Sequence, residues 1–211
     1  MAAVAALTEL LPAVQLDVPG CNDNLCILAL REAYCEFCRR SEAYAVKTTL
    51  TGDGSTVLFT LPMTPYPVGS CFVIRVLLVT INGVDQDGTY GKTVYPNQIT
   101  FETAPALAAS VVVRYALVPF RITADSVSDG ATPTPTLVPT IDFKFLNRWQ
   151  DGIVAKAKAY LMMLPKRPWS DPQRAQLCMQ QFIASIGTAR TEILREGRTV
   201  DLVMTPPDIF V

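Results

Sequence analysis

The sequence predicts an α+β fold in which helices from both ends of the chain pack together around an inserted antiparallel β-sandwich-like module. Three observations predict it. Apolar residues recur with helical spacing before residue 44, β-branched runs separated by turn residues fill 45–120, and helical spacing returns over 142–197. Because the helices and strands form separate runs and do not alternate, the pattern favours α+β over α/β.

Two helices are expected within residues 1–44. The first covers residues 2–11 and ends at Pro12, and a turn-rich segment, 14–24, follows it. The second covers residues 25–41, where apolar side chains recur at steps of three and four residues. These side chains are Leu30, Tyr34, Phe37 and either Cys38 or Ser41. The pattern indicates an amphipathic helix with one buried face.

Strands are expected over residues 45–120, in runs rich in β-branched and aromatic residues. The runs are 46–50, 56–61, 71–81, 98–103 and 110–118. Gly52-Asp53-Gly54 and Asn82-Gly83 are turn signals, and a segment rich in proline, 62–69, predicts a long connection. The Thr- and Pro-rich segment 121–141 shows no periodicity and predicts an exposed loop.

A helical hairpin is expected at the carboxy-terminal end. Its first helix, over 142–164, ends at Pro165, and its second begins at a capping box formed by Ser170 and Gln173 and extends to Glu196, before Gly197. The first apolar stripe comprises Leu146, Trp149, Ile153, Ala157, Tyr160 or Leu161, and Leu164. The second comprises Ala175, Cys178, Phe182, Ile186, Ala189 and Ile193. Residues 198–211 are an extended tail with an apolar tip, which we expect to dock on a partner.

Composition argues against several functional classes. Half of the residues are hydrophobic and only 18% are charged, so some apolar surface is expected to contact another chain. The net charge is −1 with scattered Lys and Arg, which argues against sequence-specific nucleic-acid binding. The longest apolar run, 71–84, contains Arg75 and is too short to span a membrane. The absence of histidine removes the usual general base, so no catalytic role is expected.

Six cysteines leave two interpretations open. Cys21, Cys26, Cys35 and Cys38 are candidate zinc ligands by number, but Cys35 and Cys38 fall within a helical run, not on the knuckle turns typical of structural zinc sites. We therefore favour reduced cysteines that act as small buried hydrophobic residues, with no metal and no cofactor.

Two stretches resemble a known family. Residues 16–21 (Leu-Asp-Val-Pro-Gly-Cys) lead into residues 29–41, which end in Phe-Cys-Arg-Arg-Ser. This is similar to the opening of tailed-bacteriophage head-to-tail adaptor proteins, also called connector or head-completion proteins. Residues 149–172, with Pro-Lys-Arg-Pro-Trp-Ser-Asp-Pro at their end, and 175–190 resemble the helical hairpin of the same group. The matches cover residues 1–44 and 142–197, and the β module agrees only in type.

The resemblance implies a virion structural protein at the head–tail junction, assembled in the cytoplasm of a host bacterium. Its subunits would form a ring, commonly of twelve copies, under the portal protein, with a tail or neck protein below and DNA passing through the lumen. The tail of the family extends into the portal, which makes the end of this chain the candidate docking segment. Its residues are Thr205, Pro206, Pro207, Ile209, Phe210 and Val211. Trp169, in the hairpin turn, is a candidate subunit contact.

Two other classes remain open. The β module could be an independent glycan- or protein-binding unit of the virion, with the helices serving oligomerisation. An enzyme with a cysteine nucleophile would need a basic, exposed thiol environment, because the chain offers no histidine to activate the thiol.

Overall fold

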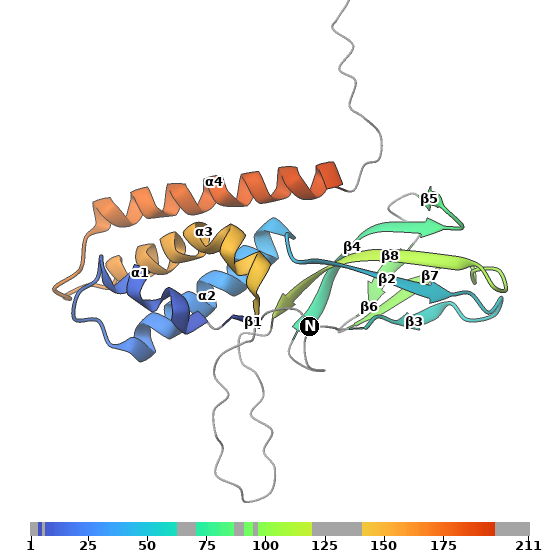
Figure 1. The fold of residues 1–211 in the computed structure, drawn as a ribbon, viewed down its shortest axis with the longest axis horizontal. Coiled ribbons are helices and arrows are strands. Elements are labelled where there is room, and N and C mark those ends of the chain that lie inside the picture. The colour runs from blue at the N-terminus through green and yellow to red at the C-terminus, as the bar shows by residue number, and fades with distance from the viewer. Residues whose placement is uncertain are drawn as a thin grey trace, which may run out of the picture.

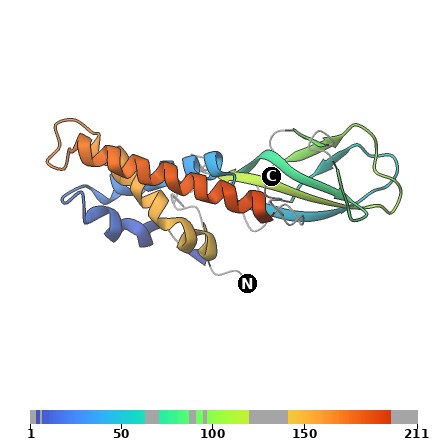
Figure 2. The ribbon, with the colours of Figure 1, turned by 90° about the horizontal axis from the view of Figure 1, so that it is seen from above.

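The computed structural model describes residues 4–5, 7–62, 71–86, 91–94, 97–119 and 141–196, and it confirms the α+β fold. The molecule is elongated, with a helical body at one end and a β sandwich at the other (Figure 1). A view from above shows the same serial arrangement (Figure 2). Helices from both ends of the chain form the helical body, and the sandwich is inserted between them in the sequence. None of the described helices is both long and apolar enough to cross a membrane.

The start of the chain differs from the prediction. A short strand, β1 (Val4–Ala5), is followed by a 3₁₀ helix (Leu7–Leu10) and by α1 (Leu11–Gln15), so the prediction of one helix ended by Pro12 is wrong. Pro12 lies in the first turn of α1, where its missing N–H costs no helical hydrogen bond. The loop predicted for residues 14–24 therefore begins only after Gln15.

The second predicted helix is confirmed as α2 (Asp23–Ser41). The Asn22 side chain caps it by accepting a 2.8 Å hydrogen bond from the N–H of Asn24. Glu42 ends it in the left-handed conformation, with φ of 57°. The predicted apolar stripe is buried, and it includes both Cys38 and Ser41. Ser41 can be buried because its hydroxyl donates a 2.7 Å hydrogen bond to the carbonyl of Phe37.

Two antiparallel sheets form the sandwich. One has the order β2-β8-β4-β5 and the other β3-β7-β6. Their bounds are β2 (Ala45–Thr51), β3 (Leu58–Thr60), β4 (Cys71–Ile81), β5 (Val84–Gln86), β6 (Gly91–Val94), β7 (Gln98–Phe101) and β8 (Ser110–Pro119). All five predicted strands are present, while β5 and β6 were not predicted. The turn expected at Asn82-Gly83 joins β4 to β5, and both residues have the positive φ that this hairpin turn requires.

The carboxy-terminal hairpin is confirmed as α3 (Phe143–Met162) and α4 (Pro172–Glu196). The choice between Tyr160 and Leu161 is settled, since Leu161 is fully buried and Tyr160 is exposed. The predicted cap is wrong by one residue. Asp171, not Ser170, accepts the 3.0 Å hydrogen bond from the N–H of Arg174, because Pro172 occupies the first helical position.

The segments that connect the helices also differ from the prediction. Ser170, the predicted cap of α4, donates a hydrogen bond of 3.4 Å to the carbonyl of Met162, across the hairpin turn. A strand that was not predicted, β9 (Ile141–Asp142), pairs with β1 and ties the start of the chain to the start of α3. The rest of the predicted loop, most of the 62–69 connection, and Gly197 lie outside the described residues.

The helical body and the sandwich share one core. Aromatic rings from α2, α3 and α4 fill the helical side, with Phe37 in contact with Phe145, Trp149 and Phe182. At the junction the ring of Tyr44 lies 5.3 Å from that of Phe145, and the Tyr44 carbonyl accepts a 2.9 Å hydrogen bond from the N–H of Leu117 in β8. The two parts are therefore continuous in packing, although they lie in series.

Candidate interaction surfaces

The cysteines do not form one cluster. Cys21 and Cys26 interact with each other at the start of α2, whereas Cys38 lies near Cys35 and Cys71 at the other end of that helix. In the part of the chain that the structure describes, no three His, Cys, Asp or Glu side chains are arranged so that they could hold a metal ion. The four candidate zinc ligands, all described, are thus separated into two pairs.

Burial also governs the reactivity of these thiols. It raises the pKa of Cys26 to about 12, and it raises the pKa of Cys38 well above the usual value of a thiol. Both groups are therefore protonated at neutral pH, whereas a cysteine nucleophile must be a thiolate. They pack as small hydrophobic residues in the core.

The two tryptophans lie at different depths in the hairpin. Trp149 packs its ring 5.7 Å from that of Phe37, so it belongs to the aromatic core. Trp169 lies in the turn between α3 and α4, packs partly against the core, and has the Arg167 guanidinium 6.0 Å from its ring. Its buried Nε1 has no acceptor among the described residues. Trp169 therefore packs against the core of its own chain, and its contact with a neighbouring subunit stays a prediction.

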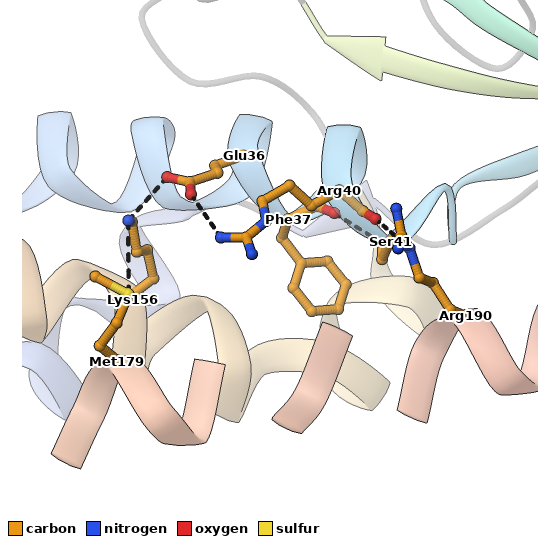
Figure 3. Close-up of polar contacts among 7 residues, drawn as sticks. All are labelled: Glu36, Phe37, Arg40, Ser41, Lys156, Met179 and Arg190. Atoms are coloured by element: carbon orange, nitrogen blue, oxygen red, sulfur yellow. Dashed lines mark hydrogen bonds and ion pairs between the residues drawn. The ribbon is translucent and has the colours of Figure 1, made fainter. Parts of the chain in front are cut away.

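A row of charged side chains joins the three long helices. Glu36 accepts hydrogen bonds from Lys156 at 2.9 Å and from Arg40 at 3.2 Å (Figure 3). The Lys156 Nζ also lies 5.3 Å from the centre of the Phe182 ring in α4. Although burial favours its neutral form, the Lys156 hydrogen bond and charge lower the pKa of Glu36. We call Glu36, Arg40 and Lys156 the charged seam. Their charges are paired with each other within the chain.

Arg190 ties α4 to the end of α2 by a different bond. Its Nε donates a 2.7 Å hydrogen bond to the main-chain carbonyl of Arg40, in the last turn of α2 (Figure 3). A helix end leaves its last carbonyls without intrahelical donors, so a cationic side chain from a neighbouring helix is a favourable partner there.

A half-open groove lies beside the charged seam, between α2 and α3. It has a volume of about 370 Å³ and is lined by Leu28, Ala29, Glu32, Ala33, Glu36, Lys156 and Tyr160. Ala29 and Ala33 are buried at its floor, while Leu28 and Tyr160 are 46% and 44% exposed. The small apolar floor and exposed apolar rim of this α2–α3 groove suit an apolar side chain of another molecule, and the rest of its lining is charged, from Glu32, Glu36 and Lys156.

The outward side of α4 has an unusual composition. Figures 1 and 2 show α4 along the outside of the helical body, over α3. Between Arg174 and Arg190 the sequence has no charged residue. Arg174, Gln181 and Arg190 are exposed, and other exposed positions form what we call the α4 outer face: Gln173, Gln176, Leu177, Gln180, Ile183, Ala184, Gly187, Thr188 and Thr191. Leu177 is 60% exposed and Ile183 is 50% exposed. Solvated helix faces normally carry charged side chains, so this face has the character of a contact surface.

The far end of the sandwich also exposes apolar side chains. The loop between β7 and β8 carries Leu107, which is 78% exposed, and the neighbouring loop after β2 carries Val57. The two loops are held together by hydrogen bonds between Gly52 and the 108–109 main chain, at 2.8 and 2.9 Å. A Cβ at Gly52 would lie 2.3 Å from the carbonyl oxygen of Ala106, so this sandwich tip requires glycine.

The predicted portal-docking residues, Thr205, Pro206, Pro207, Ile209, Phe210 and Val211, lie outside the described residues. The α2–α3 groove and the α4 outer face were not predicted. Neither a model of a known protein family nor a curated protein matches the chain. The functional proposal is therefore based on the residues of the chain and on their arrangement in the structure.

Proposed function

We propose that this chain is a head-to-tail adaptor subunit of a tailed bacteriophage, a virion structural protein that assembles as a ring under the portal and links it to tail or neck components. The observation that carries the proposal is the serial arrangement of two different parts in one elongated molecule (Figure 1). A subunit that joins two assemblies needs separate contact surfaces, and the helical body and the sandwich tip each expose apolar side chains.

The resemblance of residues 1–44 and 142–197 to adaptor proteins gives the orientation. In the proposed arrangement the helical body lies near the portal and the sandwich tip points toward the tail. The net charge of −1 suits a ring through which DNA passes without being bound by sequence. The role is a structural one, located in the virion, and it needs no cofactor.

The carboxy-terminal segment is the proposed portal anchor. Residues 197–211 follow α4, and a segment of that length can extend about 50 Å. It ends in Ile209, Phe210 and Val211. Three apolar residues in succession at a chain end gain free energy when a partner removes them from water.

The test is the mass of the purified chain, by light scattering, alone and after mixing with the portal ring of the same genome, followed by imaging of the complex. A large portal-dependent particle with rotational symmetry is expected. Deletion of residues 198–211 should abolish it. A second variant replaces Ile209, Phe210 and Val211 by serine and keeps the length of the tail. It should also abolish binding, because the proposed anchor is the apolar tip and not the length of the segment.

A control variant alters the opposite end of the molecule, away from the proposed portal contact. Leu107→Asp, at the sandwich tip, should leave the portal complex intact and weaken joining to the tail or neck protein. If the full chain forms no complex with the portal or with any neck component, the proposal fails. The sandwich as an independent binding module would then be the hypothesis to test.

A further inference from the structure

We infer that neighbouring copies of this chain contact each other through two different surfaces of the helical body, with the α4 outer face of one copy received by the α2–α3 groove of the next. That the chain forms a ring belongs to the proposed function, on which this inference rests. The inference adds which surfaces hold the subunits together. Contact between two unlike surfaces of identical chains is heterologous, and such contacts generate rings when the rotation closes.

The α4 outer face has no charged residue between Arg174 and Arg190, which are exposed near its two ends. Gln173, Gln176 and Gln180 can donate and accept hydrogen bonds across an interface, and none of them carries a charge that would have to be desolvated. Leu177 and Ile183 project from this face into solvent in the single chain. Covering them removes apolar surface from water, which favours association.

Small residues in the centre of the face permit close approach. Ala184, Gly187 and Thr188 are all exposed, and a Cβ built on Gly187 would meet nothing within 4 Å. Glycine is less favourable than alanine in an exposed helix interior, and the packing of the single chain offers no reason for it. Contact with another chain at this position supplies one.

The α2–α3 groove is complementary to this face in shape, and two of its three charged lining residues, Glu36 and Lys156, are paired with each other. Its floor of Ala29 and Ala33 is concave, whereas Leu177 projects from the convex surface of a helix. Glu36 at its edge is paired with both Lys156 and Arg40. An uncharged helix face can therefore cover the groove without leaving the Glu36 carboxylate unpaired.

The size of the contact explains why assembly would need a template. The α4 outer face runs from Gln173 to Thr191 and is about 28 Å long, at 1.5 Å per residue. With a helix width of about 10 Å it covers roughly 300 Å² per copy, against about 800 Å² per partner in a stable interface. Free chains are then mostly monomeric, and the contact holds once a portal presents several copies side by side.

Paired charge substitutions test this contact directly. Leu177→Glu on the α4 outer face and Leu28→Lys at the groove rim should each reduce ring formation on the portal at least tenfold. An equal mixture of the two variants should restore it, because the glutamate face meets the lysine groove and the unchanged surfaces meet each other. Both positions are exposed, so melting temperatures should stay near that of the unmodified chain. Leu107→Glu, at the sandwich tip, is the matched control and should leave ring formation unchanged.

A photo-crosslinking amino acid at position 177 separates this inference from the proposed function. Isotope-labelled and unlabelled chains are mixed, alone at high concentration and with the portal, and the crosslinked peptides are identified by mass spectrometry. Crosslinks between copies that map to residues 28–36 or to Tyr160, with the rescue above, support the contact, whether or not the portal binds. Crosslinks to the portal alone, or to another region of a second copy, overturn it while leaving the adaptor proposal standing. A portal complex without rescue or copy-to-copy crosslinks also overturns it, and absence of both complex and crosslinks overturns both.

Discussion

The helical body and the β sandwich are stabilised in different ways. In the helical body, side chains make the specific contacts, with the aromatic rings around Phe37 inside and, around them, ion pairs that link the helices to each other and to the turn after α1. The pairs include Glu36–Lys156 at 2.9 Å, Lys158–Asp17 at 2.6 Å and Arg148–Glu192 at 2.7 Å. In the sandwich, main-chain ladders set the register, and β-branched side chains such as Val111 and Val113 fill the space between the sheets.

The difference shows where single side chains matter most. A helix satisfies its own main-chain hydrogen bonds, so only side-chain contacts fix its position against another helix. A strand is held by its neighbours through the main chain, so each side chain decides less of the geometry. Substitutions at helix–helix contacts should therefore cost more than comparable substitutions between the sheets, and this expectation can be tested from its largest effect to its smallest.

Phe37→Ala should have the largest effect. Phe37 is fully buried and its ring contacts three others, so truncation should lower the free energy of unfolding by about 4 kcal/mol. Both tryptophans lie in the hairpin, so their fluorescence reports the helical body, while far-UV circular dichroism also reports the strands. Denaturant unfolding followed by both probes measures the change.

Phe101→Ala, in the sandwich, is the matched control for Phe37→Ala. Phe101 is also buried, and its ring contacts that of Phe59 in β3. Main-chain ladders to β3 and β6 hold its strand, β7, in place, so the loss should be smaller. Coincident transitions by the two probes would show that the shared core unfolds as one unit. A Phe37→Ala loss below that of Phe101→Ala would contradict the comparison.

Asp17→Asn should have the next largest effect. The Lys158 hydrogen bond, aided by the charge of Lys158 and by Arg174, lowers the pKa of Asp17, so the folded state favours the carboxylate. This stability is present above the unfolded pKa of about 4 and is lost as pH falls below it. At neutral pH the substitution should cost about 2 kcal/mol, and the difference should shrink as the pH is lowered through 4. Thermal unfolding over a pH series measures it. Asp151→Asn, at an exposed position of α3, should change little.

Much of the fold could be predicted because long elements repeat their signals. In α2, α3 and α4 each apolar stripe spans several turns, so no single misplaced residue changes the prediction. The prediction for the start of the chain was wrong because proline can either end a helix or begin one, and Pro12 lies in the first turn of α1. The strands β5 and β6 were missed because their sequences, Val-Asp-Gln and Gly-Lys-Thr-Val, are short and mostly polar, whereas the equally short β3 and β7 carry aromatic and β-branched residues.

The candidate surfaces could be predicted only in part. The stretch from 175 to 189 without a charge is visible in the sequence, and placing its exposed positions on one helix face would have revealed the α4 outer face. The α2–α3 groove could not be found in this way. It depends on how α2 and α3 pack, which brings Leu28 and Tyr160 to one rim although they are far apart in the chain.

Gly152→Ala tests how closely α3 and α4 approach each other. A Cβ at this position would lie 2.7 Å from the Cβ of Ser185 in α4, so the helices would have to move apart. The strain should exceed the gain of about 1 kcal/mol from helix propensity and leave a net loss of about 1 kcal/mol in thermal unfolding. Adding Ser185→Gly should recover stability beyond the sum of the single changes. A stabilised Gly152→Ala variant would show that the approach is looser than described.

Gly187→Ala, also in the hairpin, should have the smallest effect and the opposite sign. It lies at an exposed position of α4 with open space around a built Cβ, so alanine should raise the free energy of unfolding of the single chain by about 0.5–1 kcal/mol. If the α4 outer face packs closely on a second copy, the added methyl group should also weaken portal-templated ring formation. Thermal unfolding of the monomer and light scattering with the portal measure the two effects separately. If Gly187→Ala makes the monomer more stable and ring formation weaker, Gly187 serves contact with another chain. If ring formation is unchanged, close approach at Gly187 is not part of the contact between copies.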